Sequence, residues 1–152
     1  MVRIRDMSEA SRTSSASYDF LAFEDRPWVT PPPPEERRVA VVSSAGIHRQ
    51  GDKPFAWNDH DWRSFPRDQR DFYLSHASVN FDRSGFMQDR NLYLPFDRLE
   101  ELVAEGSLGS LAPTHYSFMG GSTTPEQFLP HAETAVAAMK AEGVNTVVLA
   151  PV

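Results

Sequence analysis

Three of the five histidines in this 152-residue sequence lie beside or just after segments that read as strands. His48 follows a first apolar run, His76 follows a shorter second run, and His115 lies beside a third. Histidine titrates near neutral pH, so imidazoles gathered at one sheet edge suit acid–base catalysis or substrate binding. Three separate hydrogen-bonded loop histidines would explain the same pattern equally well. For His60 and His131 the sequence favours that second, structural interpretation.

Small residues close the first and third apolar runs. Ser43 and Ser44 stand where a nucleophile often lies, yet no GxSxG sequence surrounds them. Gly120 and Gly121 precede a predicted helix, but GGSTT matches no phosphate-binding loop, so we interpret them as a tight turn rather than an anion site. The candidate pocket for a substrate or partner comprises five residues: Ser43, His48, Asp52, His76 and His115.

Nitrogen and oxygen side chains that suit a metal are present between residues 48 and 76. They are His48, Asp52, His60, Asp61 and His76. No pair among them has a ligand spacing such as HExxH, which places two histidines on one helix face. We therefore predict no metal site, and a metal-dependent hydrolase stays a third interpretation that would need bound zinc or iron in the purified protein.

Composition excludes several classes of function. The net charge of −6 and the pI near 5.3 disfavour binding to nucleic acid or to an anionic membrane, both of which need a positive field. No secretory signal or membrane-spanning run is visible. Cysteine is absent, which removes disulfides, thiolate zinc sites and a cysteine nucleophile from this chain. We expect a cytoplasmic protein with no cofactor of its own.

Two regions differ in composition. Residues 1–37 read as an N-terminal arm that is rich in serine and contains a run of four prolines, Pro31–Pro34. Such a run forms a stiff polyproline II segment, which serves as a spacer or, less often, as a ligand for an SH3-like partner. Residues 38–152 read as a single domain.

Apolar runs in the domain predict strands at residues 39–42, 72–76, 114–119 and 144–152. We expect no long element between residues 47 and 69. Two helices lie among the strands. The first has a capping-box spacing from Asp97 to Glu100 and ends near Gly106, and the second has Thr124 as its N-cap and ends at Gly143. This alternation predicts an α/β fold with a mostly parallel sheet and flanking helices in Rossmann-like layers.

Three segments of the sequence resemble those of a known family: VAVVSSAGIHRQGDKPF, SHASVNFDRSGFMQDRNLYLPFDRLEELVAEGSLGSLAPTHYSFMGG and AEGVNTVVLAPV. In this order they resemble the selenoprotein B family, the substrate-binding subunits of glycine, sarcosine, betaine and D-proline reductases and their shorter bacterial relatives. The resemblance covers residues 38–152 and leaves out the arm. His48, His76 and His115 lie inside the matching motifs, and their assignment to a pocket follows from position alone.

In that family, the segment similar to VVLAPV is followed by selenocysteine or cysteine, two residues, and a cysteine. The sequence here stops at Val152, and UGA, the selenocysteine codon, is ordinarily read as a stop. The resemblance therefore implies a selenoprotein truncated just before its redox motif. It also implies a selenolate that displaces an amine from the α-carbon of an amino acid or betaine. A pyruvoyl group on a partner subunit and a thioredoxin-type disulfide system would complete the cycle.

The expected function is thus that of an oxidoreductase of the glycine, betaine or D-proline reductase type whose redox pair is missing, so that this chain is inactive. The expected partners are a small-molecule substrate and a pyruvoyl-type or thioredoxin-type protein, with no nucleic acid and no membrane. The alternative is a non-catalytic α/β binding module derived from the same family.

Overall fold

The computed structural model describes residues 4–17, 28–77, 83–120 and 124–152. Its main sheet has five strands: β1 (Arg38–Ser43), β3 (Trp62–Pro66), β5 (Ser110–Leu111), β6 (Thr114–Phe118) and β7 (Thr146–Ala150). β7 pairs in parallel with one side of β1, and β5 and β6 share its other side, also in parallel. β3 pairs antiparallel with the outer side of β6. The mixed α/β class with a mostly parallel sheet is confirmed, and Rossmann-like layering stays a prediction.

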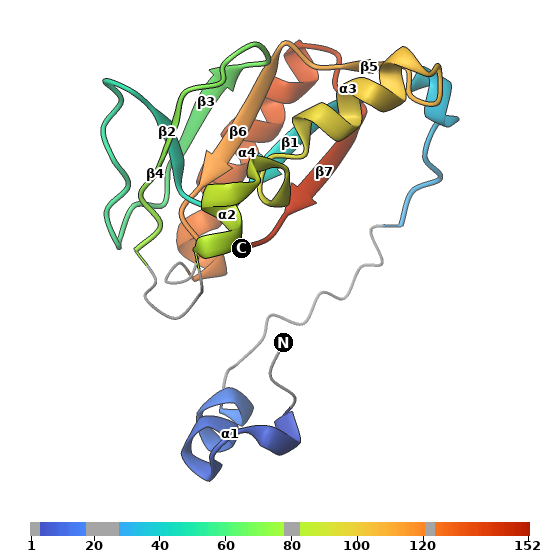
Figure 1. Ribbon diagram of the computed structural model, residues 1–152. Helices are drawn as coiled ribbons and strands as arrows, with labels where there is room; N and C mark the ends of the chain where they lie inside the picture. Colours follow the sequence, from blue (N-terminus) through green and yellow to red (C-terminus); the bar gives the residue numbers. More distant parts are fainter. Residues whose placement is uncertain (1–3, 18–27, 78–82, 121–123) are drawn as a thin grey trace.

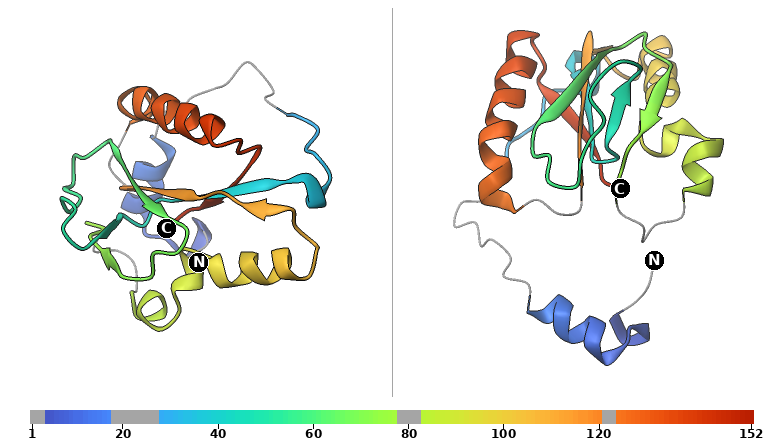
Figure 2. Two further views of the ribbon diagram at one scale, coloured as in Figure 1. Left: turned by 90° about the horizontal axis from the view of Figure 1, so that it is seen from above. Right: turned by 90° about the vertical axis from the view of Figure 1, so that its left-hand side faces the viewer.

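β1 is the central strand because every one of its inner residues is apolar and small enough to pack on both faces. Val39 and Val41 contribute to an apolar cluster with helix α3 (Phe96–Ala104). Ala40, in contrast, belongs to a cluster with helix α4 (Pro125–Ala141). The two helices lie on opposite sides of the sheet (Figure 2, left). The sheet is therefore buried on both faces along β1, as a parallel sheet requires.

Both predicted ends of helix α4 are confirmed, the capping box at Thr124 and the terminating glycine at Gly143. The backbone N–H of Thr124 donates to Oε1 of Gln127 (3.3 Å), and Gly143 has the positive φ of 75° that ends the helix. Helix α3 is confirmed as a helix, but its predicted cap is wrong. Its N-cap is Pro95, and Asp97 lies in the first turn, where its carboxylate accepts hydrogen bonds from Asn91 and Arg90.

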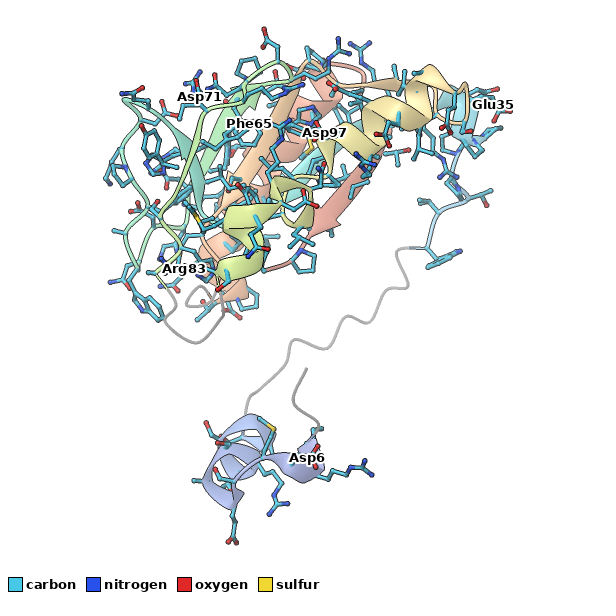
Figure 3. The ribbon with its side chains drawn as sticks, viewed as in Figure 1. Asp6, Glu35, Phe65, Asp71, Arg83 and Asp97 are labelled. Atoms are coloured by element: carbon cyan, nitrogen blue, oxygen red, sulfur yellow. The ribbon has the colours of Figure 1, made fainter. Side chains whose placement is uncertain are left out.

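The region between residues 47 and 69 holds two short strands that the sequence did not reveal, β2 (Ile47–Arg49) and β3. β2 pairs antiparallel with β4 (Phe72–Leu74), so the second predicted strand exists but belongs to a separate two-stranded sheet. We call this pair the β2–β4 ribbon. It folds against the main sheet through Phe72, whose ring meets the buried Phe65 at 4.9 Å between centroids (Figure 3).

The remaining elements are short: η1 (Ile4–Asp6), α1 (Glu9–Ala16), η2 (Pro34–Glu36), α2 (Ser84–Gln88) and η3 (Arg90–Leu92). α1 was not predicted, and Ser8 caps it by accepting the N–H of Ser11 (3.2 Å). The proline run is fixed to the domain at its end, because the Pro34 carbonyl accepts the N–H of Gly109 (3.0 Å). The division into an arm and a domain stays a prediction. In the described ranges, no helix combines the length and the apolar character needed to cross a membrane.

Candidate functional site

The carboxyl ends of β1, β6 and β7 lie at one edge of the main sheet, because β6 and β7 both pair in parallel with β1; in Figure 1 the arrowheads of β6 and β7 point to this edge. Ser44 joins them. Its N–H donates to the Ala150 carbonyl (3.1 Å), its carbonyl accepts the N–H of Gly120 (3.0 Å), and its hydroxyl accepts the N–H of Val152 (2.9 Å). In open α/β sheets, ligands bind outside the carboxyl ends of the strands. We therefore take this edge, centred on Ser44, as the candidate site.

Ser43, a predicted pocket residue, lies one position before this junction and is completely buried. Its hydroxyl accepts the N–H of Ala45 (3.3 Å) and so stabilises the turn after β1. Gly120 fits the same turn closely, because a Cβ there would lie 3.0 Å from the Ser44 carbonyl oxygen. This contact explains why a glycine stands at position 120, while the predicted tight turn at Gly120 and Gly121 includes residues outside the described ranges and stays a prediction.

His76 lies against this edge. Gly46 approaches its backbone so closely that a Cβ on the glycine would be 3.1 Å from the backbone nitrogen of His76 and 3.2 Å from Sδ of Met119, the residue after β6. The Arg83 guanidinium donates a hydrogen bond to the His76 carbonyl (Arg83 is labelled in Figure 3). Burial, and then the charge of Arg83, lower the pKa of His76, so that its imidazole is neutral at pH 7.

His48 lies near His76 through Ser75. The Ser75 hydroxyl is 3.1 Å from Nδ1 of His48, donates to the Gly46 carbonyl (3.2 Å) and accepts the N–H of Phe55 (2.9 Å). The Ser75 hydroxyl thus links His48 of the β2–β4 ribbon to Gly46, the residue that packs against the His76 backbone. The structure brings these two histidines into one region, and it does so through the β2–β4 ribbon rather than through neighbouring parallel strands.

Asp52 serves the turn at the end of β2. Its carboxylate accepts hydrogen bonds from Nε (3.0 Å) and Nη2 (3.1 Å) of Arg49, a bidentate pair that fixes the loop. The hydrogen bond from Arg49 holds the pKa of Asp52 below its ordinary value, against the opposing effect of burial. Its predicted place in the pocket stays a prediction, and the contacts present explain the residue structurally.

His115 lies inside β6 and is fully buried. Four residues of extended strand, roughly 13 Å, separate it from Met119 at the site edge. Its Nδ1 accepts the N–H of Val41 (3.0 Å), and its ring packs on Phe96 with 4.5 Å between centroids. Burial, followed by the charges of Arg67 and Arg70, lowers the pKa of His115 to about 4.

The Val41 contact replaces a regular sheet hydrogen bond. The N–H of Ala112 donates to the Val39 carbonyl (2.8 Å), so a regular parallel ladder would next pair the Val41 N–H with the Ala112 carbonyl. The strand is interrupted between β5 and β6, at Ala112 and Pro113, and the imidazole of His115 accepts that N–H instead. His115 therefore completes the ladder across the interruption, a structural role that its sequence context did not reveal.

The structure has two concave surfaces that could admit a ligand, one of which reaches the candidate site. A groove of about 470 Å³, which we call the α4 groove, runs between α4 and strands β1 and β7 and reaches Ser43 and Ser44. Most of its lining is apolar. A cleft of about 710 Å³, which we call the β4 cleft, lies between β4 and the α2–η3 segment. Its lining includes both charges and aromatic rings: Arg70, Tyr73, Phe86, Arg90, Tyr93 and Asp97.

Tyr73, which lines the β4 cleft, packs its ring beside that of His48 with 5.7 Å between the ring centroids. Arg90 donates to Asp97 across the cleft wall (2.8 Å), so one cationic and one anionic group are held in place. Of the five side chains considered as possible metal ligands, Asp61 pairs with Arg63 (2.8 Å), and within the described ranges no three histidine or carboxylate side chains are grouped for a metal ion.

Comparison with known proteins identifies the family. Residues 35–152 match the family model of glycine/sarcosine/betaine reductase selenoprotein B (GRDB), so the chain belongs to this family of reductase components. The chain is 34% identical over 115 residues to D-proline reductase subunit gamma of Acetoanaerobium sticklandii, covering 73% of the chain and 47% of that protein. It is 36% identical over 62 residues to glycine reductase complex component B subunit gamma of Carboxydothermus hydrogenoformans, covering 41% and 14%.

The matched region thus spans less than half the length of each of these relatives. No solved structure gives a significant match. The family match contains every strand of the main sheet and every residue of the candidate site, and it leaves out the described elements η1 and α1.

Sequence reasoning missed two residues that hold the site together. Ser44 was considered as a nucleophile, but its contacts make it the junction of three strands. Ser75 was not considered at all. The signal for Ser44 was present in the sequence, since small residues after a buried parallel strand mark the loop of a site. Nothing local distinguishes Ser75 from any other loop serine.

Proposed function

We propose that this chain provides the scaffold and the substrate-facing surface of a selenoprotein B-type oxidoreductase. Such an enzyme reductively cleaves the carbon–nitrogen bond of a small amino acid or betaine. The observation that supports this most directly is the family match over residues 35–152, which includes the whole carboxyl edge centred on Ser44. The names of the two relatives, both subunits of reductases, support a partner-dependent enzyme.

The redox group of this enzyme lies outside these 152 residues. The sequence contains no cysteine, and hydroxyls, imidazoles and carboxylates do not cycle between oxidised and reduced states as sulfur and selenium do. A selenolate or thiolate, when present, would displace the amine and become bonded to the α-carbon. Attack of a neighbouring thiol on that selenium or sulfur would release the deaminated acid, whose α-carbon takes up a proton, and would leave a selenenylsulfide or disulfide that a dithiol of the thioredoxin type would reduce. A pyruvoyl group, if used, belongs to a partner subunit.

Residues of this chain have supporting roles in the proposal. The neutral imidazole of His76 is suited to exchange a proton at the carboxyl edge, because its lowered pKa keeps it unprotonated at pH 7. Ser44 fixes the direction in which the chain leaves β7. The β4 cleft offers Arg90 for a substrate carboxylate and the Tyr73 and Tyr93 rings for an ammonium group.

The test compares two forms of the protein: the 152-residue chain, and an extended form in which a cysteine follows Val152 together with the corresponding residues of D-proline reductase subunit gamma. Each is given glycine, sarcosine, betaine or D-proline with dithiothreitol, and substrate loss is followed by NMR. We expect no turnover by the first form and dithiol-dependent turnover by the second. Dithiol-dependent reduction by the 152-residue chain, free of added protein, would refute the proposed location of the redox group.

The absence of cysteine also favours a second candidate, a non-catalytic binding module of the same family. Calorimetric titration with the same four compounds separates the two candidates. A binding module retains ligand affinity while the extended form stays inactive. The variant Tyr73→Leu should weaken binding in the β4 cleft under either candidate, whereas Leu129→Ala, on the exposed surface of α4, should leave it unchanged.

A further inference from the structure

The α4 groove is bounded by a sheet face that is only half covered. Leu149 of β7 is 71% exposed and Val147 is 41% exposed, and both line this groove. Val136 on the facing side of α4 is 44% exposed. On the opposite face of β7, Val148 packs against the buried cluster of α3. A parallel strand is normally buried on both faces, so β7 has the packing of a strand whose second covering layer is missing from this set of residues.

Helix α4 does not supply that layer. It packs over β6 and its neighbours: the Phe128 ring meets Phe118 at 4.5 Å between centroids, and Thr134 accepts the indole N–H of Trp62 (3.0 Å). Trp62 belongs to β3, on the far side of β6 from β7. α4 is therefore centred toward the β3 side of the sheet, and the groove beside it lies over β7.

The outer edge of β7 is also suited to pairing. Among the described residues only β1 pairs with β7, so the other edge of Thr146–Ala150 carries open backbone donors and acceptors. The segment TVVLA has no charge and no proline, the residues that natural proteins place on edges to prevent pairing. The exposed apolar side chains and the unpaired backbone edge thus belong to the same strand, β7.

The handedness of crossover connections determines which kind of element fits the α4 groove. β6, α4 and β7 form a crossover between two parallel strands that passes over β1. Such crossovers are right-handed in nearly all proteins. A further crossover of the same hand, continuing outward past β7 to a new edge strand, places its helix on the same face of the sheet as α4. The position of that helix is the α4 groove.

We propose that the α4 groove is the docking site for one amphipathic α-helix whose following strand adds in parallel to the open edge of β7. We assign this helix and strand to the part of a reductase subunit that lies outside the matched region, and for this identity the proposal rests on the proposed function. More than half of D-proline reductase subunit gamma lies outside the match, ample for a strand–helix–strand unit of roughly 30 residues. A second copy of this chain fits less well, because its own α4 is already packed and offers no helix for the groove.

The probe is the longest segment of D-proline reductase subunit gamma outside the matched residues, produced as a separate polypeptide and titrated onto the 152-residue chain. We expect a complex of one to one by light scattering, and slower hydrogen exchange at the amides of Thr146–Ala150. Leu149→Asp should weaken the affinity at least tenfold. Leu102→Asp makes the same substitution on α3, on the opposite face of the sheet, where Leu102 is 41% exposed; it is the control and should leave the affinity unchanged.

Three outcomes would overturn the proposal: no complex with a chain shown to be folded by circular dichroism, a complex that Leu149→Asp and Val136→Asp leave intact, or a homodimer of the chain that Leu149→Asp dissociates. The last outcome would identify a second copy as the occupant. Because binding is measured without substrate or redox chemistry, its failure is distinct from the failure of the proposed function, which the turnover assay detects.

Discussion

Lowering the pH from 7 to 4.5 tests the structural role of His115. Its Nδ1 accepts the N–H of Val41, so the neutral ring carries its proton on Nε2. Protonation would turn Nδ1 into a donor that faces another donor and would place a charge beside the rings of Phe65 and Phe96. The folded protein therefore resists protonation of His115, whereas the unfolded chain does not.

The size of the effect follows from the two pKa values. The ordinary value is 6.5, and the folded value is about 4. Between these two pH values the unfolded state binds the proton and the folded state does not, so the free energy of unfolding falls as the pH falls through this window. Each pKa unit corresponds to about 1.4 kcal/mol, and the two pH units between 6.5 and 4.5 give a loss of about 2.5 kcal/mol. His76, whose pKa is also lowered, adds to the loss with the same sign.

Urea unfolding followed by tryptophan fluorescence at pH 7, 6, 5 and 4.5 measures this loss, since the chain contains three tryptophans. His115→Gln keeps a side chain that can accept the Val41 N–H but does not titrate, so its stability should vary less with pH. His60→Gln is the control and should keep the wild-type dependence. If His115→Gln lost stability between pH 7 and 4.5 as steeply as the wild type, the burial argument for His115 would be wrong.

Three further substitutions test the packing. Gly109→Ala should destabilise the protein by about 1–3 kcal/mol, because the new Cβ would lie 2.4 Å from the Glu35 carbonyl oxygen. Gly85→Ala is the control and should not destabilise the protein, because its Cβ meets only the flexible end of a side chain. The urea midpoints of the two variants are compared. Ser44→Ala should cost about 0.5–1.5 kcal/mol and speed hydrogen exchange at Val152, and unchanged exchange would contradict the strand junction. Phe65→Ala should cost about 3–5 kcal/mol in the same unfolding assay, and a loss below 1 kcal/mol would contradict its place in the core.

The parts of the fold that the sequence predicted are those with a strong local pattern. β1 and β7 are runs of β-branched and apolar residues, β6 contains Tyr116 and Phe118 and ends before a glycine pair, and α4 begins at Thr124 with a complete capping box. Each signal depends on residues close together in the chain. The wrong cap of α3 shows where local reasoning fails, since Asp97 is held by Asn91 and Arg90 from the preceding turn rather than by the N–H groups of its own helix.

β2 and β3 escaped prediction because their burial comes from partners far along the chain. In β3 only Phe65 is fully buried, and Trp62 packs its edge on Tyr116, about fifty positions away. The three residues of β2 show no alternation long enough to detect. They become a strand because they pair with Phe72–Leu74, and that pairing is what carries His48 to the region of His76.

The histidines show why residue type and spacing locate only part of a site. His48, His76 and His115 stand in similar positions relative to apolar runs, yet the first two meet through Ser75 and the third fills a gap in the sheet ladder. What separates them is a two-residue interruption of a strand at Ala112 and Pro113, which leaves the Val41 N–H in need of an acceptor. A buried N–H without a partner is costly, so the nearest suitable side chain takes that role. The register of β1 against β5 decides which residue this is, and register depends on contacts more than seventy residues apart.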